Sequence, residues 1–381
     1  MIRYERPSAR PLSDVPPGGE VETVLGPDGR ADPARDPGLD VALVVRIYEG
    51  MLRTRLLDDR MLNLQRQGRV SFHVGCRGEE AAIIASAAAL RDEVDWIFPC
   101  YRELGALLWR GFPLQSYVDN MYGNADDQVR GRQMPDHVTG KRYLYGSVSS
   151  PIGTQIMHAV GVAWAGKIKR EDTVAAAFLG EGATSTPDFH TGMNFAGVFK
   201  TPNVFLCRNN RWAISVPSDK QTASASFAGK AIAYGIKGVR CDGNDALAVF
   251  HTVREARERA QRGEGATLIE LLTYRLGGHS TSDDPRAYRS NDEVETHGKS
   301  DPIVRLRRYL ELLGAWSDKD EARFTQRTES EIKQCVERAE QKPQPSLATM
   351  FDDVYRERPW HLDAQHRECA EGPRPVREHD D

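Results

Sequence analysis

A carboxylate and an amide each close an apolar run in the middle of the chain. Glu181 follows the run TVAAAFL (173–179), and Asn210 follows the run NVFLC (203–207), with Arg208 just before it. Carboxylate and amide oxygens are hard ligands that suit Mg²⁺, an ion that usually bridges a protein to a phosphate. The planar guanidinium of Arg208 would bind the phosphate itself. The spacing therefore predicts a site for Mg²⁺ and a phosphate, provided that the two runs form neighbouring strands.

The residues between the two runs predict the helix that such a site requires. Thr186, Pro187 and Asp188 offer a cap, a proline at the first helical position and an acid in the first turn. Apolar residues then recur at helical intervals. Parallel strands joined by a helix end at the same edge of a sheet, where ligands of open α/β sheets bind. Gly180 and Gly182 would let the backbone turn sharply and approach an anion.

The order of the predicted elements indicates an α/β fold: a doubly wound parallel sheet with helices on both faces, flanked by N- and C-terminal helices. Residues 1–38 are rich in Pro, Gly and charge and predict a flexible arm. The domain itself is predicted at 39–360, with a long first helix capped by Asp40, and a polar tail at 361–381. Other elements expected are helices at 78–90, 246–263, 301–314 and 320–341 and a strand at 266–276.

Composition narrows the class of protein. The 381 residues are 40% hydrophobic and 28% charged, which is typical of a soluble globular protein, and a net charge of −4 argues against nucleic-acid binding. No apolar stretch approaches the roughly 18 residues of a membrane span, and the N-terminus lacks the apolar core of a signal peptide. The six cysteines contain no C-x-x-C pair, which favours reduced thiols. We therefore expect a cytoplasmic protein that does not bind membranes.

The triplet GEG (180–182) and the pair NN (209–210) resemble the signature of enzymes that bind thiamine diphosphate (ThDP), where a GDG-type triplet precedes a double Asn at a similar distance. In that family the acid, the second Asn and a later main-chain carbonyl hold Mg²⁺, which implies Glu181, Asn210 and Trp212 here. Glu in place of the commoner Asp is also tolerated by alpha subunits of the branched-chain 2-oxo acid dehydrogenases. The resemblance covers roughly residues 40–360.

Three further segments are similar to the same family and imply its cofactor contacts. They are YRELGALLWRG (101–111), SSPIGTQIMHAVGVAWA (149–165) and GGHSTSDDPRAYRS (277–290), the last being the ordered loop over the active site. His279 in this loop would lie near the diphosphate and is a candidate for assisting acyl transfer. The residues implied for ThDP are Tyr101, Arg102, Ser150, Ile152, Glu181, Gly182, Ala183, Arg208, Asn210 and His279.

The resemblance also implies roles outside the diphosphate site. Phe72 and His73, with Tyr101, are expected to line the acyl pocket, with core packing as the alternative for the first two. Ser280 and Ser290 match positions that are phosphorylated in mammalian relatives, and we expect both to be unmodified here. A potassium site described for the family is matched by Ser149, Pro151, Thr154 and Gln155.

The reaction that the resemblance implies is oxidative decarboxylation of a 2-oxo acid, with transfer of the acyl group to the lipoyl group of an acyltransferase core. Its cofactors would be ThDP, Mg²⁺ and K⁺. The base glutamate would belong to a separate beta subunit, so we expect an α2β2 heterotetramer and an alpha chain that is inactive alone.

The substrate is less sharply indicated than the cofactor. The segments RNN, GHSTSDD and FHVGCRGEE favour branched-chain acids, 2-oxoisovalerate and 4-methyl-2-oxopentanoate. Bacterial pyruvate and acetoin enzymes share NFAG and the Asp-Asp loop and are the alternative. A phosphate- or nucleotide-binding regulator on the same fold is a more remote alternative, because it leaves the Tyr-Arg segment and the His279 loop unexplained.

Overall fold

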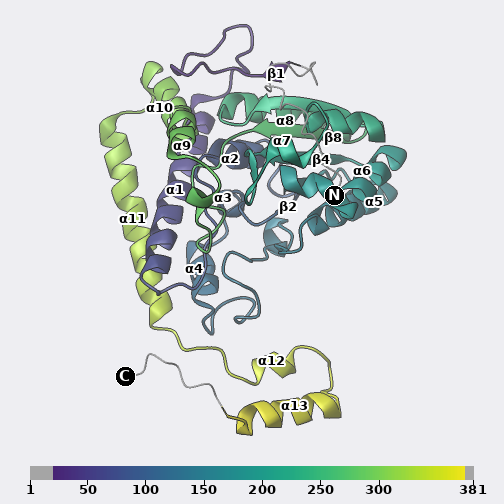
Figure 1. The fold of residues 1–381 in the computed structure, drawn as a ribbon, viewed down its shortest axis with the longest axis vertical. Helices are drawn as coiled ribbons and strands as arrows, with labels where there is room; N and C mark the ends of the chain where they lie inside the picture. The colour runs from purple at the N-terminus through teal and green to yellow at the C-terminus, as the bar shows by residue number, and fades with distance from the viewer. Residues whose placement is uncertain (1–19, 374–381) are drawn as a thin grey trace, which may run out of the picture.

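A sheet of six parallel strands lies at the centre of the computed structural model, which describes residues 20–373 (Figure 1). The strand order is β1-β7-β8-β4-β3-β2. The strands are β1 (Val21–Glu22), β2 (Trp96–Phe98), β3 (Ala175–Gly180), β4 (Asn203–Asn209), β7 (Lys237–Asp242) and β8 (Thr267–Leu272). An antiparallel hairpin of β5 (Trp212–Ala213) and β6 (Val216–Pro217) follows β4.

Alternate side chains of the central strands point to opposite faces of the sheet, and each face is covered by helices. On β3, Ala176 and Phe178 belong to one apolar core, whereas Ala177 and Leu179 belong to the other. The first core is shared with α1 (Val41–Arg66), α2 (Glu80–Ala88) and α8 (Ala246–Gln261). The second is shared with α5 (Thr154–Lys169) and α6 (Pro187–Phe199). The predicted doubly wound α/β fold is therefore confirmed.

Helices also flank the sheet at both ends of the described chain. The long α11 (Asp318–Glu340) runs beside α1, while α12 (Thr349–Asp352) and α13 (Trp360–Glu371) lie apart from the sheet at the C-terminal end (Figure 1). The remaining α-helices are α3 (Leu104–Trp109), α4 (Leu114–Tyr122), α7 (Ser218–Gln221), α9 (Asn291–Gly298) and α10 (Pro302–Leu312). Within residues 20–373, none of the helices combines the length and apolar character needed to cross a membrane.

The strand–helix–strand unit that carries the predicted site forms as expected. The hydroxyl of Thr186 accepts a hydrogen bond from the Phe189 amide at 3.3 Å and caps α6, with Pro187 as its first residue. β3 and β4 are neighbours in parallel register, with Gly180 opposite Arg208. Because both strands end at this register, the residues that follow them meet at one edge of the sheet.

The N-terminal arm differs from the prediction at its described end. Residues 1–19 lie outside the described part of the chain, but Val21 and Glu22 form β1 and pair with β7. The carboxylate of Asp245 then accepts hydrogen bonds from the amides of Val24 and Leu25, both at 2.6 Å. This short strand was not predicted because the arm as a whole is rich in Pro and Gly, a composition typical of flexible segments. The boundaries at 39–360 and 361–381 stay predictions.

We predict that Asp245→Ala lowers the free energy of unfolding by about 3 kcal/mol. The substitution removes a buried carboxylate that caps a helix and faces an arginine, so each of these groups loses its partner. Asp245 also accepts from the amides of Leu247 and Ala248 at the start of α8, and lies 3.8 Å from Arg305. Chemical denaturation measures the change.

The matched control is Asp40→Ala at the exposed start of α1, where the carboxylate caps only the Ala42 amide at 2.8 Å. This variant should lose about 1 kcal/mol. Equal losses for the two variants would contradict a role of Asp245 in holding β1.

Candidate functional site

A cavity of about 450 Å³ opens at the carboxyl edge of β3 and β4. It contains every residue predicted to contact ThDP, although these residues come from five separate segments of the chain. The cavity is lined by Tyr101, Arg102, Ser150, Ile152, Glu181, Gly182, Ala183, Arg208, Asn210 and His279, together with Phe72 and Trp212.

A buried glutamate that was not predicted from the sequence binds the residues at the end of β4. Glu79 precedes α2 and is fully buried. Its Oε1 accepts a hydrogen bond from Asn210 Nδ2 at 3.0 Å, and its Oε2 accepts one from Arg208 Nη1 at 2.5 Å. Arg102 Nε lies 3.9 Å from the same carboxylate. Since the amide nitrogen of Asn210 is held by Glu79, the amide oxygen is left to act as a ligand.

Arg208 is neutralised by carboxylates. Besides Glu79, its guanidinium pairs with Glu103, which also accepts from the Cys100 amide at 2.8 Å. Burial would lower the pKa of Arg208, but the two glutamates raise it above its usual range. Its Nε is buried without a partner among the described residues. Arg208 thus has one free hydrogen-bond donor for a phosphate. Its net positive charge is smaller than the sequence led us to expect, because two glutamates pair with it.

Glu181 has the properties expected of a residue that binds a cation. It is buried at the end of β3, and its Oε1 has no hydrogen-bond partner within the described chain. Burial, aided by the nearby Glu79 carboxylate, raises the pKa of Glu181 to about 7. An unpartnered buried carboxylate oxygen is costly unless a cation or donor binds it. The donor set therefore fits a hard cation such as Mg²⁺.

The other two predicted ligands have partial partners. Asn210 Oδ1 accepts from the Trp212 amide at 3.2 Å, and the Trp212 carbonyl accepts from Arg275 Nη1 at 3.0 Å. Each oxygen retains a second lone pair that can face a metal ion. No group of three or more His, Cys, Asp or Glu side chains in residues 20–373 forms a metal cluster, so a metal here depends on amide and carbonyl oxygens.

The two glycines of the GEG triplet differ in how much space a side chain would have. Gly180 has an extended backbone, and a Cβ there would meet nothing within 4 Å. A Cβ on Gly182 would lie 2.7 Å from Cβ of Ala213 in β5. Only Gly182 therefore needs to be glycine for a close approach, and the predicted sharp turn at Gly180 is wrong.

Arg102 joins the cavity to the loop 277–290. Its Nη2 lies 2.8 Å from the carbonyl oxygen and 3.1 Å from Nδ1 of His279. Because arginine only donates, Nδ1 must accept, which leaves the ring proton of a neutral His279 on Nε2. Burial, Arg102 and Arg275 lower the pKa of His279 to about 4. Tyr101 packs edge-on against this imidazole, with ring centroids 5.8 Å apart.

His137 is a second cavity residue that the sequence did not reveal. Its Nδ1 lies 3.0 Å from the Pro135 carbonyl and must be protonated; in the neutral ring, Nε2 then accepts from the Ser150 hydroxyl at 2.6 Å. The hydroxyl proton of Ser150 is thereby directed away from the cavity, and its oxygen is left as an acceptor toward a ligand.

Three of the four residues predicted for potassium lie together, next in the chain to Ser150 and Ile152 of the cavity. The hydroxyls of Ser149 and Thr154 both lie close to the Pro151 carbonyl, at 3.4 and 3.1 Å. Gln155 donates to the Phe178 carbonyl at 2.9 Å, while its own Oε1 is buried without a partner in the described chain. This oxygen set suits a monovalent cation.

The expected acyl pocket holds only one of the two residues proposed for it from the segment RVSFHVG. Phe72 lines the cavity, as does Tyr101. His73 is 2% exposed and lies outside the cavity, between the carboxylates of Asp58 and Asp136. The prediction that His73 lines the pocket is therefore wrong, because its charge is held by two acids that are distant from it in the sequence.

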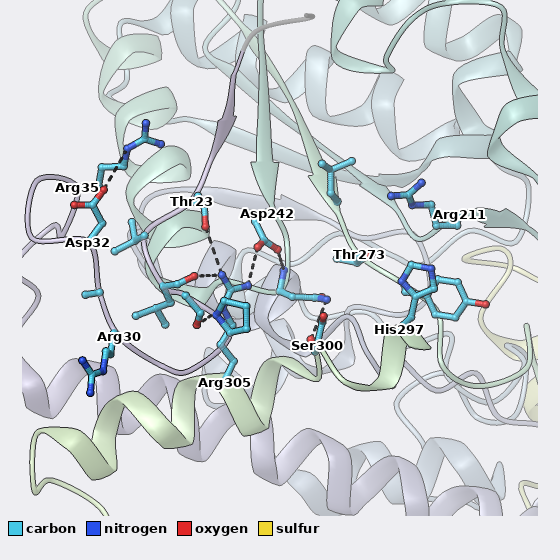
Figure 2. A pocket seen from close by; sticks show the side chains of 18 residues that line it. Thr23, Arg30, Asp32, Arg35, Arg211, Asp242, Thr273, His297, Ser300 and Arg305 are labelled. Carbon is cyan, nitrogen blue, oxygen red and sulfur yellow. Dashed lines mark hydrogen bonds and ion pairs between the residues drawn. The ribbon is translucent and has the colours of Figure 1, made fainter. Parts of the chain in front are cut away.

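A larger cavity of about 750 Å³ lies between the segment after β1 and the ends of β7 and β8 (Figure 2). None of the residues predicted to contact ThDP lines it. Both carboxylates that line it are paired, with Arg305 bound to Asp242 at 2.7 Å and Arg35 lying 3.8 Å from Asp32. The smaller cavity, with its unpartnered Glu181, is therefore the candidate site.

Several known proteins are similar to the chain over most of its length. The chain is 44% identical over 344 residues to "2-oxoisovalerate dehydrogenase subunit alpha 1, mitochondrial" of Arabidopsis thaliana, covering 90% of this chain and 73% of the relative. It is 42% identical over 349 residues to the corresponding alpha subunit of Homo sapiens, covering 91% and 78%. The Caenorhabditis elegans alpha subunit is 40% identical over 350 residues, covering 91% and 81%.

These relatives correct one prediction and identify the family. All three are named as mitochondrial proteins, which contradicts the predicted cytoplasmic location. That prediction rested on the lack of an apolar signal core, which argues only against secretion and cannot distinguish the cytosol from an organelle. The model of the family "Dehydrogenase E1 component" matches residues 48–348. The chain therefore belongs to the dehydrogenase E1 component family.

Proposed function

We propose that this chain is the alpha subunit of a ThDP-dependent dehydrogenase that oxidatively decarboxylates branched-chain 2-oxo acids. The relatives named above are 2-oxoisovalerate dehydrogenase alpha subunits, which supports the substrate class. The observation that carries the cofactor assignment is the unpartnered, buried Glu181 oxygen beside Asn210, at the end of two neighbouring strands.

Mg²⁺ would be held by Glu181, the Asn210 amide oxygen and the Trp212 carbonyl. The charge balance of the cavity argues for this ion, because Glu79 and Glu103 already neutralise Arg208. A diphosphate brings several negative charges that the remaining cations cannot offset without a divalent metal. K⁺ would be held by oxygens of Ser149, Pro151, Thr154 and Gln155.

The diphosphate would be bound by Arg102, by Nε of Arg208 and by the loop of His279. The oxygen of Ser150 is left as an acceptor by His137 and, with Ile152, would fix the orientation of the cofactor. When bound, ThDP supplies the electron sink for decarboxylation. His279, neutral with its proton on Nε2, is placed to donate a hydrogen bond during transfer of the acyl group.

Glu181 is the one carboxylate among the described residues that line the cavity, and it is assigned to Mg²⁺, so the base that the reaction needs would come from another chain. We propose that it is a glutamate of a beta subunit, which completes the site in an α2β2 heterotetramer and makes the alpha chain inactive alone. The acyl group would pass to a lipoyl group of an acyltransferase core. Ser280 and Ser290 are proposed to be unmodified; the hydroxyl of Ser290 caps α9 by accepting from the Glu293 amide at 3.2 Å.

The walls of the cavity favour a branched acyl group over the acetyl group of pyruvate. Phe72, Val74, Met134, Ile152 and Ile214 line it, so an apolar side chain would displace water from apolar surface. Each added methylene is worth about 1–3 kcal/mol of discrimination in such a pocket. Pyruvate or acetoin is the second candidate substrate class.

We predict that the chain reconstituted with its beta subunit, Mg²⁺ and ThDP turns over 2-oxoisovalerate and 4-methyl-2-oxopentanoate with at least about tenfold higher kcat/KM than pyruvate. Reduction of an artificial electron acceptor measures turnover, and the alpha chain alone is the control. A preference for pyruvate would leave the cofactor assignment standing and reject the substrate. Turnover by the alpha chain alone would reject the two-chain site.

We predict that Glu181→Gln weakens Mg²⁺-dependent binding of ThDP by at least about tenfold, because the site loses its one carboxylate ligand. Isothermal titration of ThDP into the assembled complex at several Mg²⁺ concentrations measures the change. Asp188→Asn, which removes a carboxylate from the first turn of α6 outside the cavity, is the matched control. An unchanged Mg²⁺ requirement in Glu181→Gln would contradict the metal assignment.

A further inference from the structure

A buried cluster of ionisable side chains lies behind the loop 277–290 and takes no part in cofactor binding as described above. His73, Asp58 and Asp136 are 2%, 6% and 5% exposed. Nδ1 of His73 lies 3.1 Å from Asp136 Oδ2, and Nε2 lies 3.4 Å from Asp58 Oδ1. Burial alone lowers the pKa of His73, but the two carboxylates outweigh it and raise the pKa to about 10. The imidazole is therefore held between two carboxylates, which favour its protonated form.

The same two carboxylates also bind the main chain next to His73. The amide of Val74 donates to Asp136 Oδ2 at 2.7 Å, and the amide of Cys76 donates to Asp58 Oδ2 at 2.6 Å. Hydrogen bonds to ionised groups are stronger than those between neutral groups. The cluster thus holds residues 73–77, which we call the platform, from both sides.

The platform is hydrogen-bonded to the active-site loop. The His73 amide donates to Thr281 Oγ1 at 3.1 Å, and the Thr281 amide donates back to the His73 carbonyl at 3.0 Å. At the start of the loop, the Leu276 amide donates to the Arg77 carbonyl at 3.0 Å. The platform therefore meets the chain on both sides of His279.

Arg102 links the platform to His279 directly. Its Nη1 donates to the Gly75 carbonyl at 2.6 Å, while its Nη2 donates to the His279 carbonyl at 2.8 Å. Within the described chain, the hydrogen bonds that join residues 278–282 to groups outside the loop run to Arg102 and His73. A cavity of about 650 Å³ lies beside the platform and the loop. Besides the packing of Tyr101 against His279, polar contacts with Arg102 and His73 hold this part of the loop.

We propose that His73 is a positioning residue for the active-site loop: its ion pairs with Asp58 and Asp136 fix the platform, and the platform fixes Thr281 and His279. His73 does not line the cofactor cavity, so it acts through the loop and not on the substrate. The inference rests on the proposed function in one respect, the place of His279 in the active site.

The test compares His73→Gln and Thr281→Val in the assembled complex by hydrogen–deuterium exchange. We expect the amides of residues 278–283 to exchange about tenfold faster in both variants, since each loses polar contacts between cluster, platform and loop. We also expect kcat to fall by about the same factor, while KM for the 2-oxo acid changes by less than about twofold. Ser282→Ala, at an exposed neighbouring position, is the control and should change neither.

Thr281→Val leaves the buried cluster intact, so the test stands even if His73→Gln does not fold. Unchanged exchange of residues 278–283 in Thr281→Val would overturn the proposal, as would faster exchange with unaltered kcat. A fall in kcat of His73→Gln accompanied by faster exchange throughout α1 and α4, with the loop no worse than the rest, would assign His73 to general stability instead. Exchange needs no substrate, so this result is separable from an error in the proposed substrate.

Discussion

The carboxylate of Glu79 is the interaction on which the candidate site depends. It joins the segment before α2 to the end of β4, where it holds Asn210 and Arg208, and it lies close to Arg102 from the segment after β2. A buried charge of this kind is stable only while its partners remain in place. The position of the two strand ends, the orientation of the Asn210 amide and the direction of Arg102 are therefore set together.

This arrangement leaves the site electrostatically incomplete. The buried arginine at its base is matched by two glutamates, while Glu181 is left with an unpartnered oxygen and a pKa raised by burial to about 7. A site that is short of positive charge and holds one free carboxylate oxygen favours a bound divalent ion together with an anion. The fold supplies the rigid frame, and the ligands would supply the remaining charge.

The sequence was sufficient for the fold and for most of the cavity, because continuous apolar runs, the Thr-Pro cap of α6 and the family motifs are local signals. It was not sufficient for Glu79 or for the position of His73, whose partners come from other segments of the chain and become visible only in three dimensions. His137 was missed although Pro135 and Ser150 are near it in the sequence, because no local pattern marks its contact with Ser150. β1 was missed for a related reason: its pairing with β7 depends on a distant carboxylate, Asp245, and not on its own composition.

The role of Glu79 is tested most directly by the affinity of the assembled complex for ThDP, measured calorimetrically with Mg²⁺, in Glu79→Gln and in Glu80→Gln. Glu80 is an adjacent buried glutamate that pairs with Arg55 outside the cavity. We predict that Glu79→Gln loses at least about tenfold in affinity while Glu80→Gln binds like the unmodified protein. Equal affinity in the two variants would contradict the claim that Glu79 organises the site.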